Sequence, residues 1–481
     1  MKKEFKKYIP WIVLLVIILS LSLWYVLSKR VTQEQVDQYN RKIEEAQQYT
    51  EARRYSVAMD KYYEAVDIIP KKVKAYEGLI DILILKNRID DAVEVVEKSA
   101  KPLNNQDRSV LYEKVGNGFM QIGKYQEAYD MYDTGLVLGV KNMSLELALG
   151  KVFLKLGHID QAKDQFQKGD YEGDEKAESV LLLSYIYALE DHTRAKKTLE
   201  TVDPSESMIA YYDELESVLD SLDEDSKFNA TKLSRVYINN GYPYLAIKLL
   251  EPIKEDISEY LEGIYFLGRA YFEFGNYEKA IEVLDGALTL GGMETDILWT
   301  KGRACMLIND LDNVERSYDS AIGYAGSNLN EDLVNEYIDI LLSNKQGLKA
   351  SELIKNLLQL LPDEPFLNIL AVKIYNSLSE NVKADFYLNK LSTLTLTDSQ
   401  KKEYLRWRME SMIEGEESID NYLVELEKLD KFNPYYQYFL AKSQIKEGEN
   451  ELAIKSLEKA IEYDLSYQVT QEASKLLSSL R

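Results

Sequence analysis

The feature that most constrains this chain of 481 residues is a small residue that recurs at nearly constant spacing along most of its length. It follows a turn-like segment, and most intervals are 33 to 36 residues. The positions are Ala58, Ala92, Ala128, Ala162, Ala195, Ala246, Ala280, Ala350, Ala384 and Ala453, with Val314 and Ile419 as candidates for the two gaps. Such a period is typical of a repeat architecture, in which each unit is one supersecondary motif stacked on the next.

The segment Leu261–Met293 shows the pattern of a single unit most clearly. Its small and large apolar residues lie at helical spacing on both sides of a turn at Gly275-Asn276-Tyr277. They are Leu267, Gly268 and Tyr271 before the turn, and Ala280, Leu284 and Ala287 after it. Each unit is therefore predicted to form two helices, whose small residues permit close approach and whose large residues fill the space between units.

This pattern resembles the tetratricopeptide repeat, which has a large residue, a Leu-Gly pair, a Tyr, then Ala and a second small residue. Another unit that fits contains Tyr112, Val115-Gly116, Phe119, Ala128, Tyr132 and Gly135. The resemblance covers the chain from about Tyr39 to the C-terminus and implies an all-α solenoid of roughly eleven or twelve helix-turn-helix repeats. It also implies a non-catalytic scaffold with protein or peptide partners. The Lys and Asn residues of the family's chaperone-binding clamp are not reproduced.

The regular spacing fails between Ala195 and Ala246, where the interval is 51 residues, and the repeats are also blurred between Thr393 and Pro434. The segment Glu206–Leu222 has the periodicity of a helix, so we expect an extra helix or spacer over residues 205–226. This spacer would divide an N-terminal array, residues 39–204, from a C-terminal array, residues 227–481. The last stretch, Tyr467–Leu480, is predicted to be an amphipathic helix that caps the solenoid.

The N-terminus has a different composition. A basic flank, residues 1–8, precedes a nearly continuous apolar run, Ile9–Leu27, and residues 28–38 form a juxtamembrane segment. As a helix the apolar run is roughly 28 Å long, enough to cross the hydrocarbon core of a bilayer. We therefore expect one transmembrane signal-anchor helix. A cleaved signal peptide is the alternative, but no Ala-x-Ala site follows the run.

Lysines before the apolar run favour an orientation across the membrane. Lys2, Lys3, Lys6 and Lys7 precede it, and the basic flank of a first helix usually stays in the cytoplasm. The expected product is a single-pass membrane protein with a cytoplasmic N-terminus and extracytoplasmic repeats. Basic residues also follow the run, so cytoplasmic repeats remain the alternative.

Composition argues against several functions. The formal net charge of −23 disfavours nucleic-acid binding, because the surface as a whole repels phosphate. With two histidines and one cysteine, Cys305, the chain offers no spacing typical of a metal site. The run Gly118–Lys124 matches a phosphate-loop pattern, but Tyr125 replaces the required Ser or Thr. We predict no enzymatic activity, no metal and no cofactor.

Three arginines occupy one position in successive repeats and form the candidate partner-binding site. Arg235, Arg269 and Arg303 are spaced by 34 residues. Tyr265 and Trp299 precede the last two by four residues, which places them on the same helix face. If these side chains line a groove, the guanidinium groups would bind carboxylates beside two aromatic rings. The alternative is structural pairing with carboxylates such as Glu262 and Glu273.

We therefore expect a membrane-anchored scaffold that mediates protein–protein interaction. The alternatives are an accessory subunit of a membrane assembly, envelope-biogenesis or secretion complex, and an acidic spacer that holds another component away from the membrane. Self-association is also possible, because a terminal repeat face can stack on another copy.

Overall fold

The computed structural model describes residues 31–415 and 417–481, and within these residues the chain is helical, with no strand. Contacts group them into two compact units that meet between Val115 and Gly116, inside α6. The first unit contains α2 (Gln33–Glu51), α3 (Tyr55–Ile68), α4 (Val73–Leu85), α5 (Ile89–Lys98) and the start of α6 (Asn105–Gln121).

The second unit contains the rest of α6 and all later helices. These are α7 (Tyr125–Val137), α8 (Met143–Lys155), α9 (Ile159–Lys168), α10 (Gly173–Tyr187), α11 (His192–Leu199), α12 (Ile209–Asp220), α13 (Ser226–Asn239), α14 (Pro243–Leu250), the 3-10 turn η1 (Glu251–Ile253), α15 (Leu261–Phe274), α16 (Tyr277–Leu288), α17 (Glu294–Leu307), α18 (Leu311–Ala325), α19 (Glu331–Ser343), α20 (Gly347–Leu360), α21 (Pro365–Ser377), α22 (Asn381–Leu391), α23 (Asp398–Glu414), α24 (Asp420–Leu429), α25 (Pro434–Lys446), α26 (Asn450–Tyr463) and α27 (Thr470–Leu480).

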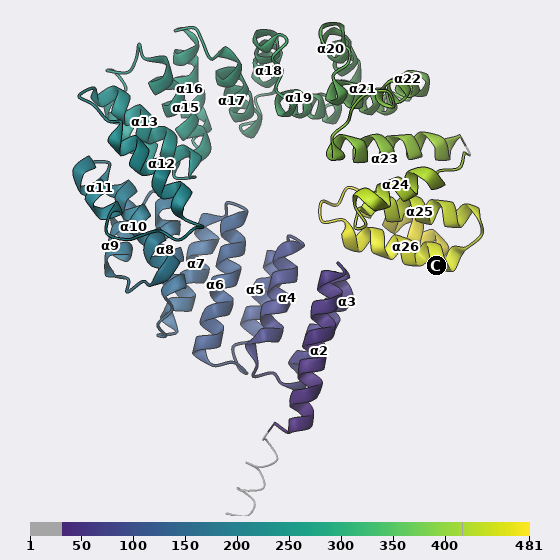
Figure 1. Ribbon diagram of the computed structural model, residues 1–481, viewed down its shortest axis with the longest axis horizontal. Helices are drawn as coiled ribbons and strands as arrows, with labels where there is room; N and C mark the ends of the chain where they lie inside the picture. The colour runs from purple at the N-terminus through teal and green to yellow at the C-terminus, as the bar shows by residue number, and fades with distance from the viewer. Residues whose placement is uncertain (1–30, 416) are drawn as a thin grey trace, which may run out of the picture. The chain divides into compact units, whose positions relative to one another are not determined.

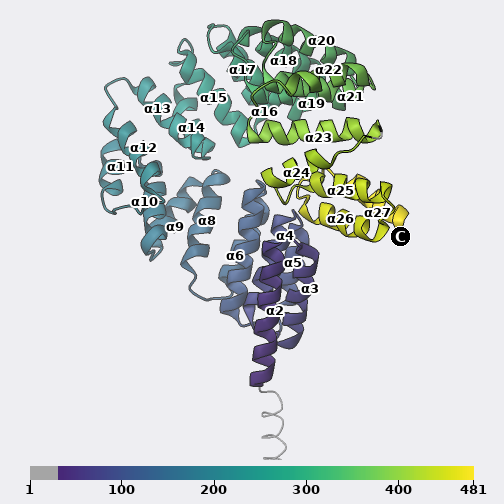
Figure 2. The same ribbon diagram turned by 45° about the vertical axis from the view of Figure 1, so that its right-hand side comes forward.

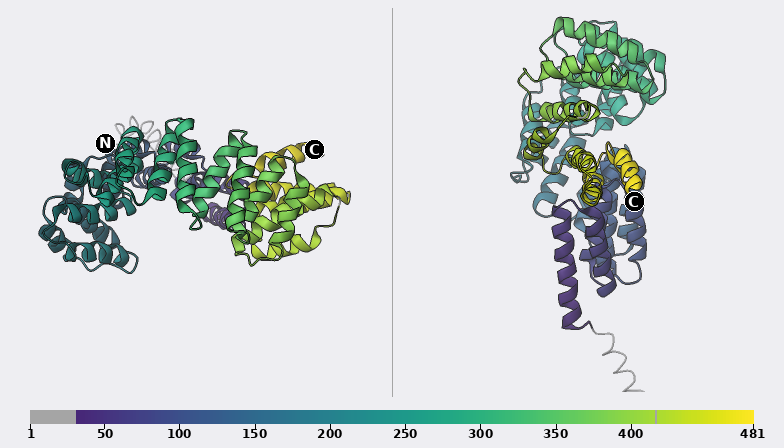
Figure 3. Two further views of the ribbon diagram at one scale, coloured as in Figure 1. Left: turned by 90° about the horizontal axis from the view of Figure 1, so that it is seen from above. Right: turned by 90° about the vertical axis from the view of Figure 1, so that its right-hand side faces the viewer.

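Consecutive helices form pairs. Of the 26 α-helices in the described part, α12 and α27 stand outside the pairing, and the other 24 make twelve pairs. Within each unit, successive pairs follow one another along the chain (Figure 1), and the same succession is visible from other sides in Figure 3. This confirms the predicted all-α solenoid of helix-turn-helix repeats.

The recurring small residue has one structural position. Ala58, Ala280 and Ala453, like the other predicted alanines and Val314, are each the fourth residue of the second helix of a pair and are buried. One assignment is wrong: Ile419 precedes α24, and the fourth residue of that helix is Leu423. The reason is that α24 begins later than the spacing predicts, after a longer connection from α23.

Glycines on the first helices let large side chains of the second helices approach closely. A Cβ added to Gly150 of α8 would lie 2.3 Å from Cε1 of Phe166 on α9, and Gly302 faces Tyr318 in the same way at 2.8 Å. In both pairs the large residue follows the glycine by 16 residues. The space that the glycine leaves is therefore filled by the ring, which supports the expected role of small residues in helix approach.

Replacement of this glycine tests the contact. Gly150→Ala forces Phe166 or the helix to move, so we expect a net loss of about 1–2 kcal/mol from overpacking. Gly286→Ala is the matched control, because Gly286 is a helical glycine whose added Cβ meets nothing within 4 Å. The control should stabilise by about 0.5–1 kcal/mol. Urea unfolding followed by circular dichroism measures both, and equal shifts would contradict the contact.

An additional helix lies where the repeat spacing fails. The helix α12 packs through Tyr212 and Leu215, which are buried, and the Tyr212 hydroxyl donates to the Ala177 carbonyl at 2.8 Å. The predicted extra helix is therefore present. The division of the repeats into arrays 39–204 and 227–481 stays a prediction, since the compact units divide at a different point.

The predicted membrane segment lies outside the described residues. These omit 1–30, which contain the basic flank 1–8 and the apolar run 9–27. Among the residues that are described, no helix combines the length and apolar character needed to span a bilayer.

The C-terminal helix α27 packs beside α26 (Figure 2) and begins at Thr470, three residues later than predicted. The buried carboxylate of Asp464 connects the two helices. It accepts hydrogen bonds from the backbone N–H of Val469 at 2.6 Å and of Thr470 at 2.8 Å, and from the Thr470 hydroxyl at 2.9 Å. Burial alone would raise the pKa of Asp464, but these hydrogen bonds outweigh it and lower the pKa below 3.8.

A carboxyl with a lowered pKa stabilises the fold only while it is ionised. The contribution of Asp464 is therefore complete above the unfolded pKa and disappears as the pH falls through the folded value, below 3.8. We expect Asp464→Asn to lower the local stability of α27 by about 1.5–3 kcal/mol at neutral pH. Hydrogen exchange of α27 at pH 7 measures this loss. Ser478→Ala, which removes an exposed hydroxyl of α27 that does not contact Asp464, is the control. Unchanged protection in Asp464→Asn would refute the role.

Candidate protein-binding groove

The three predicted arginines lie on first helices of consecutive pairs. Arg235 is on α13, Arg269 on α15 and Arg303 on α17. Two of them have a carboxylate partner: Arg269 Nε lies 4.0 Å from Glu273 Oε1, and Arg303 Nε lies 3.4 Å from Glu336 Oε1. Glu273 thus makes the structural pair that we considered.

Glu262, the other carboxylate considered for pairing with the arginines, has a different partner. Its carboxylate accepts a hydrogen bond from the Tyr260 hydroxyl at 3.2 Å. Arg235 is exposed at the surface of α13. The use of all three arginines by a partner stays a prediction.

The two predicted aromatic residues have different environments. Tyr265 is only 8% exposed and packs against Phe266, with ring centroids 5.5 Å apart, and burial raises its pKa. Trp299 is partly exposed, and its Nε1–H donates to Glu336 Oε2 at 2.8 Å. The Arg303 guanidinium carbon lies 5.8 Å from the Trp299 ring centroid and 5.4 Å from that of Phe272. Phe272, which the sequence did not single out, is therefore a second ring beside Arg303.

Trp299 and Arg303 line a pocket of about 740 Å³ between α17 and α19. The opposite wall includes Asn335, Glu336 and Asp339 of α19. A second pocket of about 370 Å³ begins at the same Asn335 and continues over α21 to α23. Because Asn335 lines both pockets, we treat them as one surface, the α17–α23 groove.

The far part of the groove repeats the chemistry of the near part. It contains Lys373 of α21 and, on α23, Glu403, Arg406 and Trp407. The Arg406 guanidinium carbon lies 4.5 Å from the Trp407 ring centroid, and Arg406 Nη1 forms an ion pair with Glu403 Oε2 at 3.6 Å. A tryptophan beside a paired arginine therefore occurs at each end of the α17–α23 groove.

The position that Arg235, Arg269 and Arg303 occupy on their helices also carries charged residues on three later first helices. Asp339 occupies it on α19, and Lys373 and Arg406 follow at intervals of 34 and 33 residues. Lys373 forms an ion pair with Asp339. Extension of the same interval past Asp339 would have found both residues.

The charge of the α17–α23 groove is slightly acidic. Its cations are Arg303, Lys373 and Arg406, and its carboxylates are Glu331, Asp332, Glu336, Asp339 and Glu403. Since three cations face five carboxylates, the arginines do not form an isolated basic patch. The expected preference for carboxylate ligands rested on unpaired arginines. With an excess of carboxylates in the groove, a ligand with positive charges fits better.

Other candidate chemistry gains no support. Cys305 is buried, and desolvation raises its pKa to about 11, so the thiol is an inert packing residue. His158 is exposed in the turn before α9. The run Gly118–Lys124 joins the end of α6 to a turn rather than a strand to a helix. No cluster of metal-ligating side chains occurs within residues 31–415 and 417–481.

Comparison with known proteins relates two of the helix pairs to a known repeat family. A family model of the tetratricopeptide repeat matches residues 261–290 and 434–467, which correspond to the pairs α15–α16 and α25–α26. These two helix pairs thus match the tetratricopeptide repeat, and the other pairs share their register of small residues. Solenoids of this kind present extended surfaces for protein–protein interaction.

Two curated relatives share part of the chain. It is 24% identical over 257 residues to the TPR repeat-containing protein MJ1428 of Methanocaldococcus jannaschii, a match that covers 49% of this chain and 41% of that protein. It is 20% identical over 235 residues to DnaJ homolog subfamily C member 3 of Bos taurus, covering 49% and 46%. The matches thus span less than half of each relative.

Among solved structures, Naa15/Naa10 bound to HypK-THB aligns over 92% of this chain and 86% of that chain. The sequence identity is 12% and the TM-score is 0.38.

Proposed function

We propose that this protein is a scaffold that binds an extended, basic segment of a partner protein along the α17–α23 groove. The observation that carries the proposal is the continuity of the two pockets through Asn335, with a tryptophan at each end. The groove is open to a chain that crosses several repeats, which is how solenoid surfaces engage partners.

The dimensions fit a short extended segment. Residues of α17, α19, α21 and α23 line the groove, and these first helices follow one another along the solenoid in Figure 1. Packed helices lie about 8–10 Å apart, so three spacings make at least about 24–30 Å. An extended chain rises about 3.3 Å per residue, so at least about eight residues are needed to span this distance.

Each kind of side chain in the groove has a role in such binding. The Asn335 amide has a donor and an acceptor, which match the N–H and C=O of an extended backbone. Trp299 and Trp407 offer flat apolar surfaces for anchor side chains at the two ends. The excess of carboxylates attracts Lys or Arg side chains, and the chain's net charge of −23 steers a basic partner toward the surface.

Defined peptides test this function. Twelve-residue peptides with one Trp and a net charge of +3 or −3 are titrated into detergent-solubilised full-length protein, and fluorescence anisotropy measures binding. We expect only the basic peptides to bind, and binding to weaken with salt. Asp332→Asn with Asp339→Asn should reduce their affinity about tenfold, as expected for loss of about 1.4 kcal/mol.

The matched control carries the same charge change on second helices. Glu278→Gln with Asp312→Asn removes two exposed carboxylates from α16 and α18, outside the α17–α23 groove. It should bind the basic peptides like the unaltered protein. Equal losses in both double variants, or equal binding of acidic peptides, would refute the groove as the binding surface.

We also propose that residues 9–27 anchor the scaffold in a membrane with the N-terminus in the cytoplasm and the repeats outside. The support is the length of the apolar run and the four lysines before it. Such an anchor would hold the α17–α23 groove near a membrane and restrict its partners to proteins of the same compartment.

Extraction and reporter fusions test the anchor. The protein should stay in the membrane fraction after alkaline carbonate treatment, whereas Leu14→Asp with Ile18→Asp should release it, since each charge opposes insertion by about 2.5–3.5 kcal/mol. A reporter fused after Arg481 that is active only outside should be active. Activity of an inside-only reporter would reverse the orientation, and carbonate release of the unaltered protein would exclude the anchor.

A further inference from the structure

The insertion that interrupts the repeats also creates a pocket. Met208 and Tyr211, from the segment around α12, cover a space of about 380 Å³ whose other walls come from α8, α10 and the end of α13. A regular repeat array has no counterpart of α12 at this place. The pocket, which we call the Lys155 pocket, is separate from the α17–α23 groove.

Lys155 brings a poorly solvated positive charge to this pocket. Its ammonium group donates to the Gly241 carbonyl and lies 4.6 Å from the centroid of the Tyr242 ring. Burial, with a smaller effect of nearby Lys151, lowers the pKa of Lys155. Lys151 itself has a carboxylate partner, Glu178 Oε1, at 2.6 Å. Among the described residues, no carboxylate lies within 4.0 Å of the Lys155 ammonium nitrogen.

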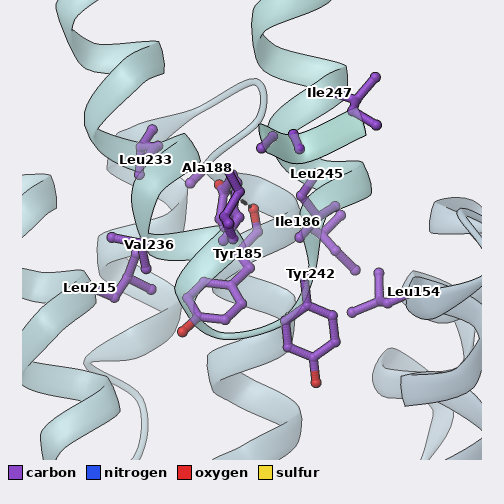
Figure 4. Packing of buried hydrophobic residues seen from close by; sticks show 14 of the residues in the cluster. Leu154, Tyr185, Ile186, Ala188, Leu215, Leu233, Val236, Tyr242, Leu245 and Ile247 are labelled. Carbon is purple, nitrogen blue, oxygen red and sulfur yellow. Dashed lines mark hydrogen bonds between the residues drawn. The ribbon is translucent and has the colours of Figure 1, made fainter. Parts of the chain in front are cut away.

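Tyr185 brings an unused hydrogen-bond donor to the same pocket. The side chain is 1% exposed, and its hydroxyl has no hydrogen-bond partner within the described part of the chain. Figure 4 shows the rings of Tyr185 and Tyr242 beside each other, with both hydroxyls directed away from Ala188 and Leu245. A buried hydroxyl without a partner is unfavourable, so its position at the pocket wall indicates a binding role.

We propose that the Lys155 pocket binds the carboxylate of a small ligand or of a peptide C-terminus, together with a short apolar body. The carboxylate would accept hydrogen bonds from the Lys155 ammonium and the Tyr185 hydroxyl, and Met208 and Tyr211 would cover the apolar part. The volume is near the lower end of ligand pockets, which fits a molecule about as large as one aromatic acid.

Nearby carboxylates explain why a monoanion fits better than a phosphate. Glu178 is part of the pocket wall, and Glu214 accepts a hydrogen bond from Asn240 Nδ2 at 2.8 Å beside Tyr185. A dianion would be repelled by both carboxylates. A single negative charge is balanced by Lys155. Burial, with a smaller effect of Glu214, raises the pKa of Tyr185, so its hydroxyl stays protonated and can donate.

Matched probes test the site. The full-length protein is titrated with 3-phenylpropanoate and with 3-phenylpropanamide, its neutral counterpart, and saturation-transfer NMR and calorimetry measure binding. We expect the acid to bind at least tenfold more tightly than the amide. Lys155→Met should reduce the affinity for the acid at least tenfold, and Tyr185→Phe about threefold to tenfold.

A matched lysine variant controls for folding and charge. Lys163 of α9 also lies over a tyrosine ring, 5.3 Å from the Tyr187 centroid, but outside the Lys155 pocket. Lys163→Met should bind the acid like the unaltered protein, and thermal unfolding should show that all variants are folded. Equal binding of acid and amide, no binding of either, or unchanged binding by Lys155→Met would overturn the proposal.

A second comparison distinguishes the two sources of the carboxylate, a peptide C-terminus and a small-molecule acid. A peptide that ends in Phe with a free carboxylate is compared with the same peptide ending in an amide. Tighter binding of the free-acid peptide than of 3-phenylpropanoate identifies a partner's C-terminus as the ligand. Exclusion of the peptide while the free acid binds identifies a small-molecule ligand.

Discussion

The rest of the structure depends on the close approach of paired helices. In each pair the fourth residue of the second helix is small or apolar and buried, and several pairs add a glycine on the first helix that faces a large side chain. The contact between Gly150 and Phe166 shows why: with a Cβ at the glycine, the ring would have no place. Because the interior is packed to high density, this contact fixes how far apart the helices lie, and the same distance is repeated along the chain.

Because the repeats have a nearly constant length, equivalent surface positions of successive first helices lie next to one another. Arg303, Asp339, Lys373 and Arg406 occupy that position on successive first helices, and each contacts an oppositely charged side chain. The pairing matters for binding, since the charges are already oriented before a partner arrives. The α17–α23 groove follows from regularity, whereas the Lys155 pocket follows from its interruption by α12.

The sequence was sufficient for the features that repeat and insufficient for those that depend on neighbouring repeats. The alanine register predicted the helix pairs, and the 51-residue interval predicted α12. Tyr265 and Trp299 have equivalent positions in the sequence, yet the first is buried and the second lines the groove, because the neighbouring pairs cover them differently. Phe272 escaped attention for the same reason, since its contact with Arg303 joins two repeats. The Lys155 pocket needs four separate helices and could not be read from any one of them.

The hydrogen bonds of Asp464 also have a consequence for the apolar surface of α26. A solenoid is a one-dimensional stack, and its last pair would otherwise offer an apolar face to any further helix. Ala453, Leu457 and Ala473 are buried where α27 packs on this end, with Asp464 holding the start of α27 in place. The carboxylate therefore governs whether this apolar side of α26 is covered: while Asp464 holds the start of α27, Ala453 and Leu457 stay shielded from water.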